Sequence, residues 1–285
     1  MALPPHLVEE IVLRALREDA PHGDITTRAV VDADSRASAR IVARAEAVVA
    51  GLPVAEAVFK AVDSRTTFSA LAAEGSRVEP GAVLAEVAGS AASILTAERS
   101  ALNFLQRMCG IATLTARFVE RLRGLPTRIL DTRKTAPGLR ILDKYAVRAG
   151  GGLNHRFGLS DGILIKDNHL LAAGGIGPAV ARARARLPML PVEVEVTTLG
   201  QVDEALAAGA DALLLDNMTP ENMRAAVKRI AGAAATEASG GVSLDNVRAI
   251  AETGVDFISV GALTHSAQAA DIALDFTEKG IDCEG

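Results

Sequence analysis

The feature of this sequence that most limits its fold is a repeated order of strand and helix after Pro126. Short apolar runs alternate there with segments of helical periodicity. The predicted strands are Arg128 to Leu130, Gly162 to Ile165, Val192 to Val196, Ala212 to Leu215 and Phe257 to Val260. This alternation predicts a parallel sheet that is covered by helices.

Two of these segments share one pattern. Residues 208–215 and 253–260 each contain a helix end, a glycine, an aspartate and then an apolar strand. Such repetition is typical of a (β/α) barrel. About 150 residues are left for it, fewer than the roughly 250 of a barrel with eight complete units. We therefore expect an α/β protein with an incomplete barrel over residues 111–266.

Residues 1–110 are predicted to form a mixed α/β domain. The apolar spacing from Pro5 to Asp19 indicates a helix. Short runs from Ala37 to Val87 alternate with glycine and proline, and Val78 to Val87 is predicted to be a hairpin. A long helix from Ser93 to Arg123 connects the two parts, and we expect Gly110 to interrupt it.

The composition excludes several classes of protein. With 49% hydrophobic and 23% charged residues, the chain is globular. A net charge of −5 and only 3% aromatic residues argue against nucleic-acid binding. Two distant cysteines make no disulfide framework, and no apolar run is long enough for a membrane helix. We expect a cytoplasmic protein with no nucleic-acid or membrane partner.

Polar residues follow the predicted strands, where a (β/α) barrel places its site. They are Asp131, Thr132, Arg133 and Lys134 after the first strand, Lys166 after the second, Glu193 and Glu195 within the third and Asp216 after the fourth, with His155 and Arg156 between the first two strands. Buried Lys166 would need either an anionic ligand or a carboxylate such as Glu195. One of the two glutamates has the alternative role of pairing with a cation of a neighbouring strand.

Ser239-Gly240-Gly241 precedes a predicted helix near the end of the barrel. Glycine-rich loops and helix amides at this position commonly bind phosphate. An ordinary turn between strand and helix is the alternative. His265 follows the last strand and has two interpretations as well, a phosphate ligand or a helix cap.

Several motifs are absent from the sequence. It contains no Walker GxxxxGK, no GxGxxG, no HExxH and no GxSxG. The hydrolase and NTPase interpretations therefore lose support.

The chain resembles the quinolinate phosphoribosyltransferases, and the resemblance extends over nearly the whole sequence. It rests on motifs at residues 23–27, 98–106, 131–140, 150–156, 165–169, 192–196, 215–217, 239–241 and 261–265. Among these are Asp131-Thr132-Arg133-Lys134-Thr135, Asn154-His155-Arg156 and Leu215-Asp216-Asn217.

The resemblance implies the type II phosphoribosyltransferase fold, with an N-terminal domain that residues 267–285 complete. It implies a homodimer in which Arg99 reaches the site of the partner subunit. The substrates would be quinolinate and phosphoribosyl pyrophosphate, with Mg²⁺ as cofactor and nicotinate mononucleotide, pyrophosphate and CO₂ as products.

Residue roles are implied in the same way. The resemblance assigns quinolinate binding to Arg99, Arg133, His155, Arg156 and Lys166. Lys134, Glu195 and Asp216 would face phosphoribosyl pyrophosphate and Mg²⁺, the two carboxylates holding the metal through water. The implied catalytic set is Lys134, Lys166, Glu195 and Asp216. Ser239, Gly240, Gly241, Gly261 and His265 would hold the 5-phosphate. Further implied substrate-binding positions are Thr132, Val260 and Ala262.

Three other functions are alternatives to quinolinate phosphoribosyl transfer. A relative with the same fold would use another acceptor, such as nicotinate, and would release no CO₂ from quinolinate. A Schiff-base lyase would use Lys134 or Lys166 as its nucleophile. A phosphosugar-binding module would bind phosphoribosyl pyrophosphate and release no pyrophosphate.

Overall fold

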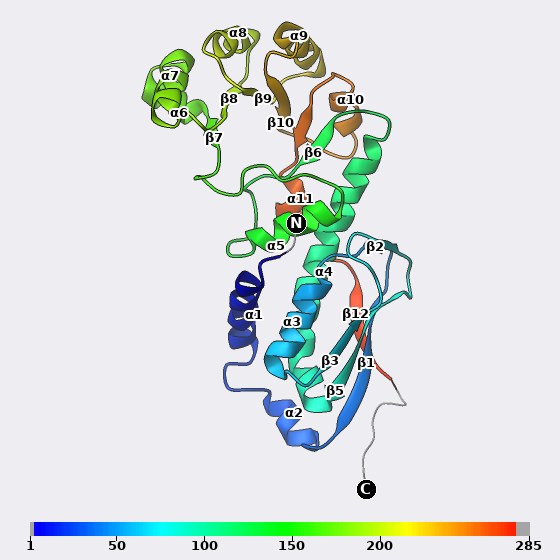
Figure 1. Cartoon of the computed structure of the whole chain (residues 1–285). Coiled ribbons are helices and arrows are strands. Elements are labelled where there is room, and N and C mark those ends of the chain that lie inside the picture. The colour runs from blue at the N-terminus through cyan, green and yellow to red at the C-terminus, as the bar shows by residue number, and fades with distance from the viewer. Residues whose placement is uncertain (1–2, 278–285) are drawn as a thin grey trace. The chain divides into compact units, whose positions relative to one another are not determined.

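A computed structural model describes residues 3–277 (Figure 1). The chain divides into two compact units. The N-terminal unit comprises Met1–Ala116, Thr135–Gly151 and Thr264–Gly285, and the barrel unit comprises Arg117–Lys134 and Gly152–Leu263. No helix in the described part of the chain is both long and apolar enough to cross a membrane.

The N-terminal unit contains a four-stranded antiparallel sheet of order β12-β1-β5-β3. Its strands are β1 (Arg36–Ala43), β3 (Thr67–Ala70), β5 (Val83–Ser90) and β12 (Ile272–Phe276). In β1 the buried Ala39 and Ile41 alternate with the exposed Arg40, which shows that one face of the sheet covers the core. Strand β12 belongs to the tail predicted to complete this domain, and residues 278–285 of that tail lie outside the described residues.

The helices of the N-terminal unit are α1 (Pro5–Asp19), α2 (Ile25–Val30), α3 (Leu52–Val62), the first part of α4 (Ala91–Arg121) and α5 (Arg140–Ala149). Helix α1 has the predicted bounds and buries Val8 and Val12. Pro5 suits its first turn, where a backbone N–H has no partner in the helix. Asp24 caps α2, because its Oδ1 accepts a hydrogen bond from the Thr27 amide at 2.9 Å.

The predicted hairpin is wrong. A turn does form, with the Ala82 amide 3.1 Å from the Glu79 carbonyl. The strand before it, β4 (Arg77–Val78), nevertheless pairs with β2 (Ala47–Val48) in a separate two-stranded sheet. Strand β5 pairs with β1 on one side and β3 on the other, so neither of its edges is left for β4.

Gly110 does not interrupt α4, which is continuous from Ala91 to Arg121. A Cβ built on Gly110 would lie 2.1 Å from the Gln268 carbonyl oxygen. The glycine therefore lets the segment before β12 approach the helix closely, and the Ala270 amide there donates a hydrogen bond to the Gln106 carbonyl at 2.9 Å.

The barrel unit contains six parallel strands in the order β6-β11-β10-β9-β8-β7. They are β6 (Arg128–Leu130), β7 (Ile163–Ile165), β8 (Val192–Val196), β9 (Ala212–Asp216), β10 (Ala235–Ser239) and β11 (Phe257–Ser259). The end strands β6 and β7 are not paired with each other in the described residues, which confirms the predicted incomplete barrel. Strand β10 was not predicted, because its sequence Ala-Thr-Glu-Ala-Ser contains no apolar run.

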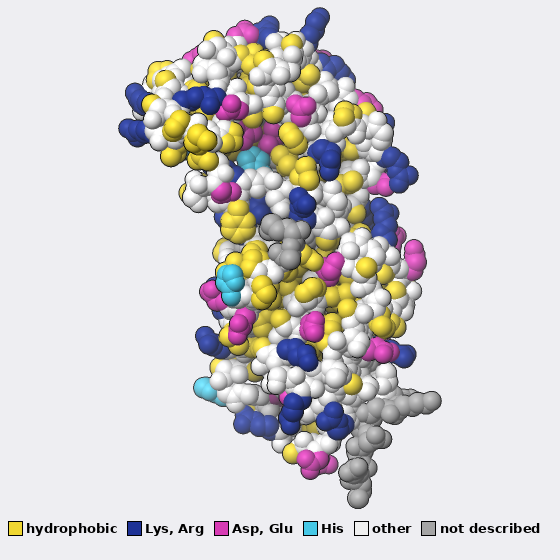
Figure 2. All heavy atoms as spheres, in the orientation of Figure 1, with side chains coloured by type: hydrophobic (Ala, Val, Ile, Leu, Met, Phe, Trp, Pro, Cys, Tyr) yellow, Lys and Arg dark blue, Asp and Glu magenta, His cyan; other side chains and the backbone are white. Residues whose placement is uncertain are grey.

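Helices follow the strands: α6 (Asp167–Ala173), α7 (Ile176–Arg186), α8 (Leu199–Ala207), α9 (Pro220–Ile230), α10 (Val247–Ala251) and α11 (Ala262–His265), which extends into the N-terminal unit. Thr198 and Thr219 cap α8 and α9 by accepting hydrogen bonds from the amides of Gln201 and Asn222. Hydrophobic side chains are gathered over α6 and α7 on the face seen in Figure 2, and Leu171 of α6 is 82% exposed.

The Gly110 contact makes a prediction about stability. Alanine normally stabilises a helix relative to glycine, by up to about 1 kcal/mol. We expect Gly110→Ala to destabilise the protein instead, by about 1–3 kcal/mol, because the new methyl group overlaps the Gln268 carbonyl. Denaturant unfolding of both variants measures the effect. The matched control is Gly177→Ala in α7, where a Cβ meets no atom within 4 Å; equal stability changes in the two variants would contradict the packing argument.

Candidate active site

The pairing register directs polar side chains of three neighbouring strands to one face of the sheet. Glu195 of β8 lies opposite Leu214 of β9, so Asp216 is the next residue of β9 on that face. Asp216 in turn lies opposite Ser239 of β10. Alternate side chains on the other face are fully buried: Val194, Val196, Leu213, Leu215 and Ala238. Glu195, Asp216 and Ser239 therefore lie on the inner face at the carboxyl ends of their strands.

Lys166 follows β7 directly and pairs with Glu195. Ile165 lies opposite Val194, which places Lys166 beside Glu195. The Lys166 Nζ donates to Glu195 Oε2, with the lysine side chain 44% exposed and the glutamate side chain 12% exposed. Of the two partners predicted for Lys166, the carboxylate is therefore the one observed, and the exposed lysine side chain remains accessible to an anion. The Lys166 amide also donates to His169 Nδ1 at 2.9 Å as α6 begins.

Asp216 is fixed by its neighbour Asn217. Asn217 has a left-handed backbone conformation, with φ at 52°. Its Nδ2 donates to Asp216 Oδ2 at 2.7 Å, and its backbone amide donates to the Ser239 carbonyl at 2.9 Å. A Cβ on Gly240 would lie 2.1 Å from Asn217 Oδ1, so this position requires glycine. The end of β9 and the loop after β10 are therefore packed tightly together.

The Ser239-Gly240-Gly241 loop adopts a conformation that other residues disfavour. Gly240 and Gly241 have φ values of 94° and 58°. The Gly241 carbonyl accepts a hydrogen bond from Asn246 Nδ2 at 2.9 Å. The following helix, α10, has five residues.

Asp131 anchors the loop that carries His155 and Arg156. Its side chain is completely buried. The carboxylate accepts hydrogen bonds from Asn154 Nδ2 at 2.6 Å and from the His155 amide at 2.9 Å. Leu153 pairs in parallel with Leu130 beside β6. Asp131 is therefore a structural residue of the site, and the first strand-end residues exposed to solvent are those that follow it.

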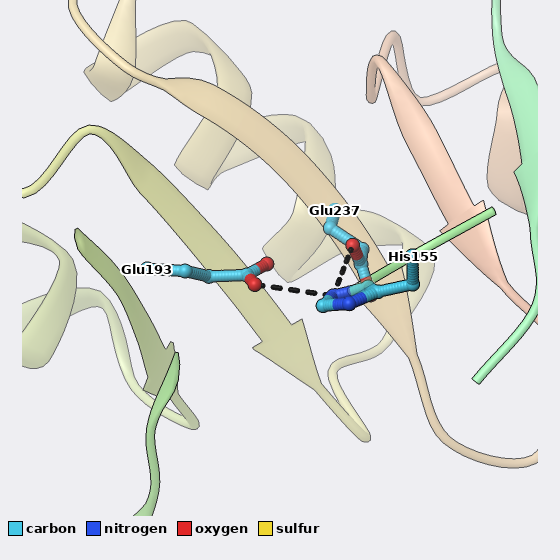
Figure 3. A group of neighbouring side chains, drawn as sticks. All are labelled: His155, Glu193 and Glu237. Atoms are coloured by element: carbon cyan, nitrogen blue, oxygen red, sulfur yellow. Dashed lines mark ion pairs between the residues drawn. The ribbon is translucent and has the colours of Figure 1, made fainter. Parts of the chain in front are cut away.

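His155 lies between two carboxylates inside the barrel unit. Figure 3 shows its ring between Glu193 of β8 and Glu237 of β10. Nε2 is 3.2 Å from Glu193 Oε2 and 3.4 Å from Glu237 Oε2. In Figure 2, acidic side chains lie beside a histidine in a recess of the barrel unit. The sequence alternative that one glutamate of β8 pairs with lysine or arginine holds for Glu195, while Glu193 pairs with histidine.

Electrostatics favour a proton in this cluster. Burial alone would lower the pKa of His155, but its hydrogen bonds to Glu193 and Glu237 outweigh burial and raise that pKa. Burial also raises the pKa of Glu193, and the charge of Glu237 adds to this effect. The Arg156 amide donates to His155 Nδ1 at 2.7 Å, which directs protons to the Nε2 side, between ring and carboxylates.

Arg156 and Arg133 provide positive charge near each other. Burial lowers the pKa of Arg156, and the charge of Arg133 lowers it further. The Arg156 guanidinium also donates to the Gly162 carbonyl at 2.9 Å, which restricts its direction. Two guanidiniums that repel each other in a partly buried place are stabilised when an anion binds between them. Beside them, the Thr132 hydroxyl accepts a hydrogen bond from the Lys134 amide at 3.0 Å.

The remaining predicted residues are distributed over both units. In the barrel unit, the Val260 amide donates to the Leu130 carbonyl at 2.9 Å, and Gly261 and Ala262 follow it. Arg99 and His265 belong to the N-terminal unit. Arg99 is exposed on α4, and His265 Nδ1 lies 2.6 Å from Ser266 Oγ.

Two residues of the site were not predicted. Glu237 was missed because β10 was missed, although a lone glutamate between small residues is a signal of an inward-facing charge. Asn217 stood in a recognised motif without a role. Asparagine directly after a strand-end aspartate is one of the few residue types that readily adopt a positive φ, and that was the available signal.

Comparisons with known proteins identify the family of the chain. Residues 24–109 match the N-terminal domain of quinolinate phosphoribosyl transferase, and residues 111–275 match its C-terminal domain. A probable nicotinate-nucleotide pyrophosphorylase (carboxylating) of Bacillus subtilis is 45% identical over 261 residues, which cover 91% of this chain and 90% of the relative. The Mycobacterium leprae nicotinate-nucleotide pyrophosphorylase (carboxylating) is 46% identical over 272 residues, covering 93% and 96%.

A solved structure has the same architecture. The nicotinate-nucleotide pyrophosphorylase of Francisella tularensis superposes with a TM-score of 0.93 at 42% identity, covering 97% of this chain and 98% of that one. Both domains and nearly the full length of the relatives are thus matched. The chain belongs to the quinolinate phosphoribosyltransferase family.

Proposed function

We propose that this chain transfers the phosphoribosyl group of phosphoribosyl pyrophosphate to quinolinate, with decarboxylation, and forms nicotinate mononucleotide for NAD biosynthesis. In a member of this family, the observation that carries the proposal is the shared inner face of Glu195 and Asp216 at the strand ends, with Lys166 against Glu195. The two carboxylates can bind a metal and stabilise a cationic sugar, and the lysine can bind an anionic substrate.

The charge distribution suits two anionic substrates. Quinolinate is a dicarboxylate and phosphoribosyl pyrophosphate carries three phosphoryl groups, whereas the chain has a net charge of −5. A local group of cations reverses the repulsion. Arginine forks match carboxylates with two hydrogen bonds, so Arg133 and Arg156 suit quinolinate, while Lys134 suits phosphate as a point charge.

Glu195 and Asp216 fit Mg²⁺. Both offer carboxylate oxygens, the ligands that Mg²⁺ prefers, at adjoining strand ends on one face. Asn217 orients one of these carboxylates. We propose that the two residues hold the metal through water, and that the bound metal neutralises the pyrophosphate that leaves.

The proposed reaction begins with cleavage of the bond between C1 of the ribose and the pyrophosphate oxygen. Positive charge develops on the ribose ring, and Glu195 and Asp216 stabilise it. The quinolinate nitrogen then forms a bond to C1 and becomes a pyridinium. When the carboxylate at C2 leaves as CO₂, the pyridinium stabilises the electron pair left on C2, and that carbon takes up a proton.

The two carboxylates of quinolinate need different treatment. A firm bidentate arginine on the departing carboxylate would stabilise the ground state, and each 1.36 kcal/mol of such excess slows the reaction about tenfold. We propose that the firmest arginine contacts go to the carboxylate that remains.

A homodimer with Arg99 donated to the partner's site is part of the proposal. Arg99 is exposed. Exposed apolar side chains of the barrel unit, Phe157 at 46%, Leu159 at 72% and Leu171 at 82%, support association with a second copy. A cytoplasmic location is proposed as well, because the buried Cys109 is a free thiol.

The first prediction concerns the reaction itself. Purified protein given quinolinate, phosphoribosyl pyrophosphate and Mg²⁺ should form nicotinate mononucleotide with one CO₂ per pyrophosphate, measured by chromatography and by release of labelled CO₂. Asp216→Asn should lower the rate roughly 100-fold or more, because it removes charge stabilisation at the ribose. Turnover of nicotinate but not quinolinate would favour a different acceptor, and pyrophosphate release without either base would contradict the transferase.

The second prediction concerns the glycine loop. Gly240→Ala should raise the KM for phosphoribosyl pyrophosphate at least tenfold, because its methyl group would displace Asn217 and the loop. Gly232→Ala is the matched control, since Gly232 also has a positive φ, 81°, and a Cβ there meets no atom within 4 Å. Steady-state kinetics and thermal unfolding compare the variants. Unchanged kinetics in Gly240→Ala, or the same change in both variants, would contradict a role for the contact with Asn217.

The third prediction tests the shared site. Arg99→Ala and Lys166→Ala chains, each inactive alone, should regain roughly a quarter of wild-type activity when mixed and reassociated, because half of randomly formed dimers are mixed and each contains one intact site. Native mass spectrometry confirms that mixed dimers form. Absence of activity in those dimers would contradict donation of Arg99.

A further inference from the structure

The cluster of His155, Glu193 and Glu237 lies deeper in the barrel unit than the strand-end residues. Glu193 is the second residue of β8 and Glu237 the third of β10. The three side chains border a cavity of about 390 Å³ that is also lined by Ala212 and Ala235, the first residues of their strands. The cluster therefore lies closer to the amino ends of β9 and β10 than Asp216 and Ser239 do.

His155 joins parts of the open barrel that the sheet does not join. Its loop runs beside β6, where Leu153 pairs with Leu130, and continues toward β7. From this loop the ring reaches Glu193 of β8 and Glu237 of β10 (Figure 3). The contact with both carboxylates thus fixes a loop that spans the two unpaired end strands.

The ring of His155 is held at both nitrogens. Nδ1 lies 2.7 Å from the Arg156 amide, which donates to it, and Nε2 faces both carboxylates. A divalent cation on Nε2 would have to displace the ring proton that these two carboxylates stabilise, so this arrangement disfavours a metal although three ligand-type side chains meet here.

The carboxylates depend on this donor. Glu237 is 4% exposed, and its Oε1 has no hydrogen-bond partner among the described residues. The side chains of His155 and Glu193 are each 14% exposed. A buried carboxylate without a hydrogen-bond donor costs free energy. Both carboxylates therefore hold the Nε2–H of His155 inside the barrel, and the ring is then oriented with Nδ1 toward Arg156.

We propose that Glu193 and Glu237 are positioning residues for quinolinate binding: by holding His155 Nε2 they fix the ring and, through Nδ1, the backbone of Arg156, one of the two arginines proposed to bind quinolinate. The inference rests on the proposed function for its substrate and goes beyond it in assigning two residues that contact neither substrate. The Arg156 guanidinium is also anchored by its hydrogen bond to the Gly162 carbonyl, and the charges of Glu193 and Asp161 act on it.

The test compares Glu193→Gln, Glu237→Gln and the double variant with Glu221→Gln, an exposed glutamate of α9. The double variant should raise the KM for quinolinate at least tenfold, while the KM for phosphoribosyl pyrophosphate changes less than twofold and the control behaves as wild type. A general structural defect would move both KM values. Equal changes in both, or no change in either, would overturn the proposal.

Ring ¹⁵N NMR of the whole protein provides a readout that does not need activity. The His155 resonances are assigned with His155→Gln among the five histidines. The ring should lose its proton at a lower pH in the double variant than in wild type, because Glu193 and Glu237 stabilise the protonated form and raise its pKa. The same titration in both proteins, or stoichiometric Mn²⁺ binding that broadens these resonances, would overturn the proposal. If wild type binds no quinolinate, the proposed function fails, while the titration still decides whether the two glutamates hold His155.

Discussion

The parallel register of β8, β9 and β10 directs carboxylates into the barrel, and the rest of the site depends on how they are neutralised. Alternation of side chains places Glu193, Glu195, Asp216 and Glu237 on the inner face. Charges in such a place are costly unless they are paired and hydrogen-bonded. Each carboxylate has such a partner: His155 lies at two of them, Lys166 at the third and Asn217 at the fourth.

The ion pair of Lys166 and Glu195 shows how such a site accepts ligands. With the pair intact, a cation and an anion of the protein neutralise each other. A metal at Glu195 and an anionic substrate at Lys166 would exchange each partner for a ligand of the same sign, so the local charge balance is preserved on binding. The partial exposure of Lys166 makes this exchange accessible from solvent, whereas the deeper His155 cluster has no comparable exposure and suits a permanent structural contact.

Much of the barrel could be predicted because its strands are short apolar runs and its polar residues follow them. Lys166, Glu195 and Asp216 were found by reading strand ends. Strand β10 was hidden because alanine, threonine and serine give no apolar signal, and Glu237 was hidden with it. The false hairpin and the continuous helix at Gly110 have another cause: both depend on segments distant in the sequence, β1 and β3 in one case and Gln268 in the other. Local patterns do not contain such contacts.

The unpaired end strands of an open barrel need stabilising contacts, and the same contacts fix the loop that we propose for substrate recognition. Within residues 3–277, the end strands β6 and β7 have no strand partner on their outer edges apart from the single Leu153 bridge. Residues 153–162 connect this bridge with β7, and they are held by Asp131 from one side and by the His155 cluster from inside. Arg156 lies within this held segment. A guanidinium placed on a free loop would lose much of its binding energy to ordering, so fixing the loop to buried carboxylates serves the fold and the affinity for an anion together.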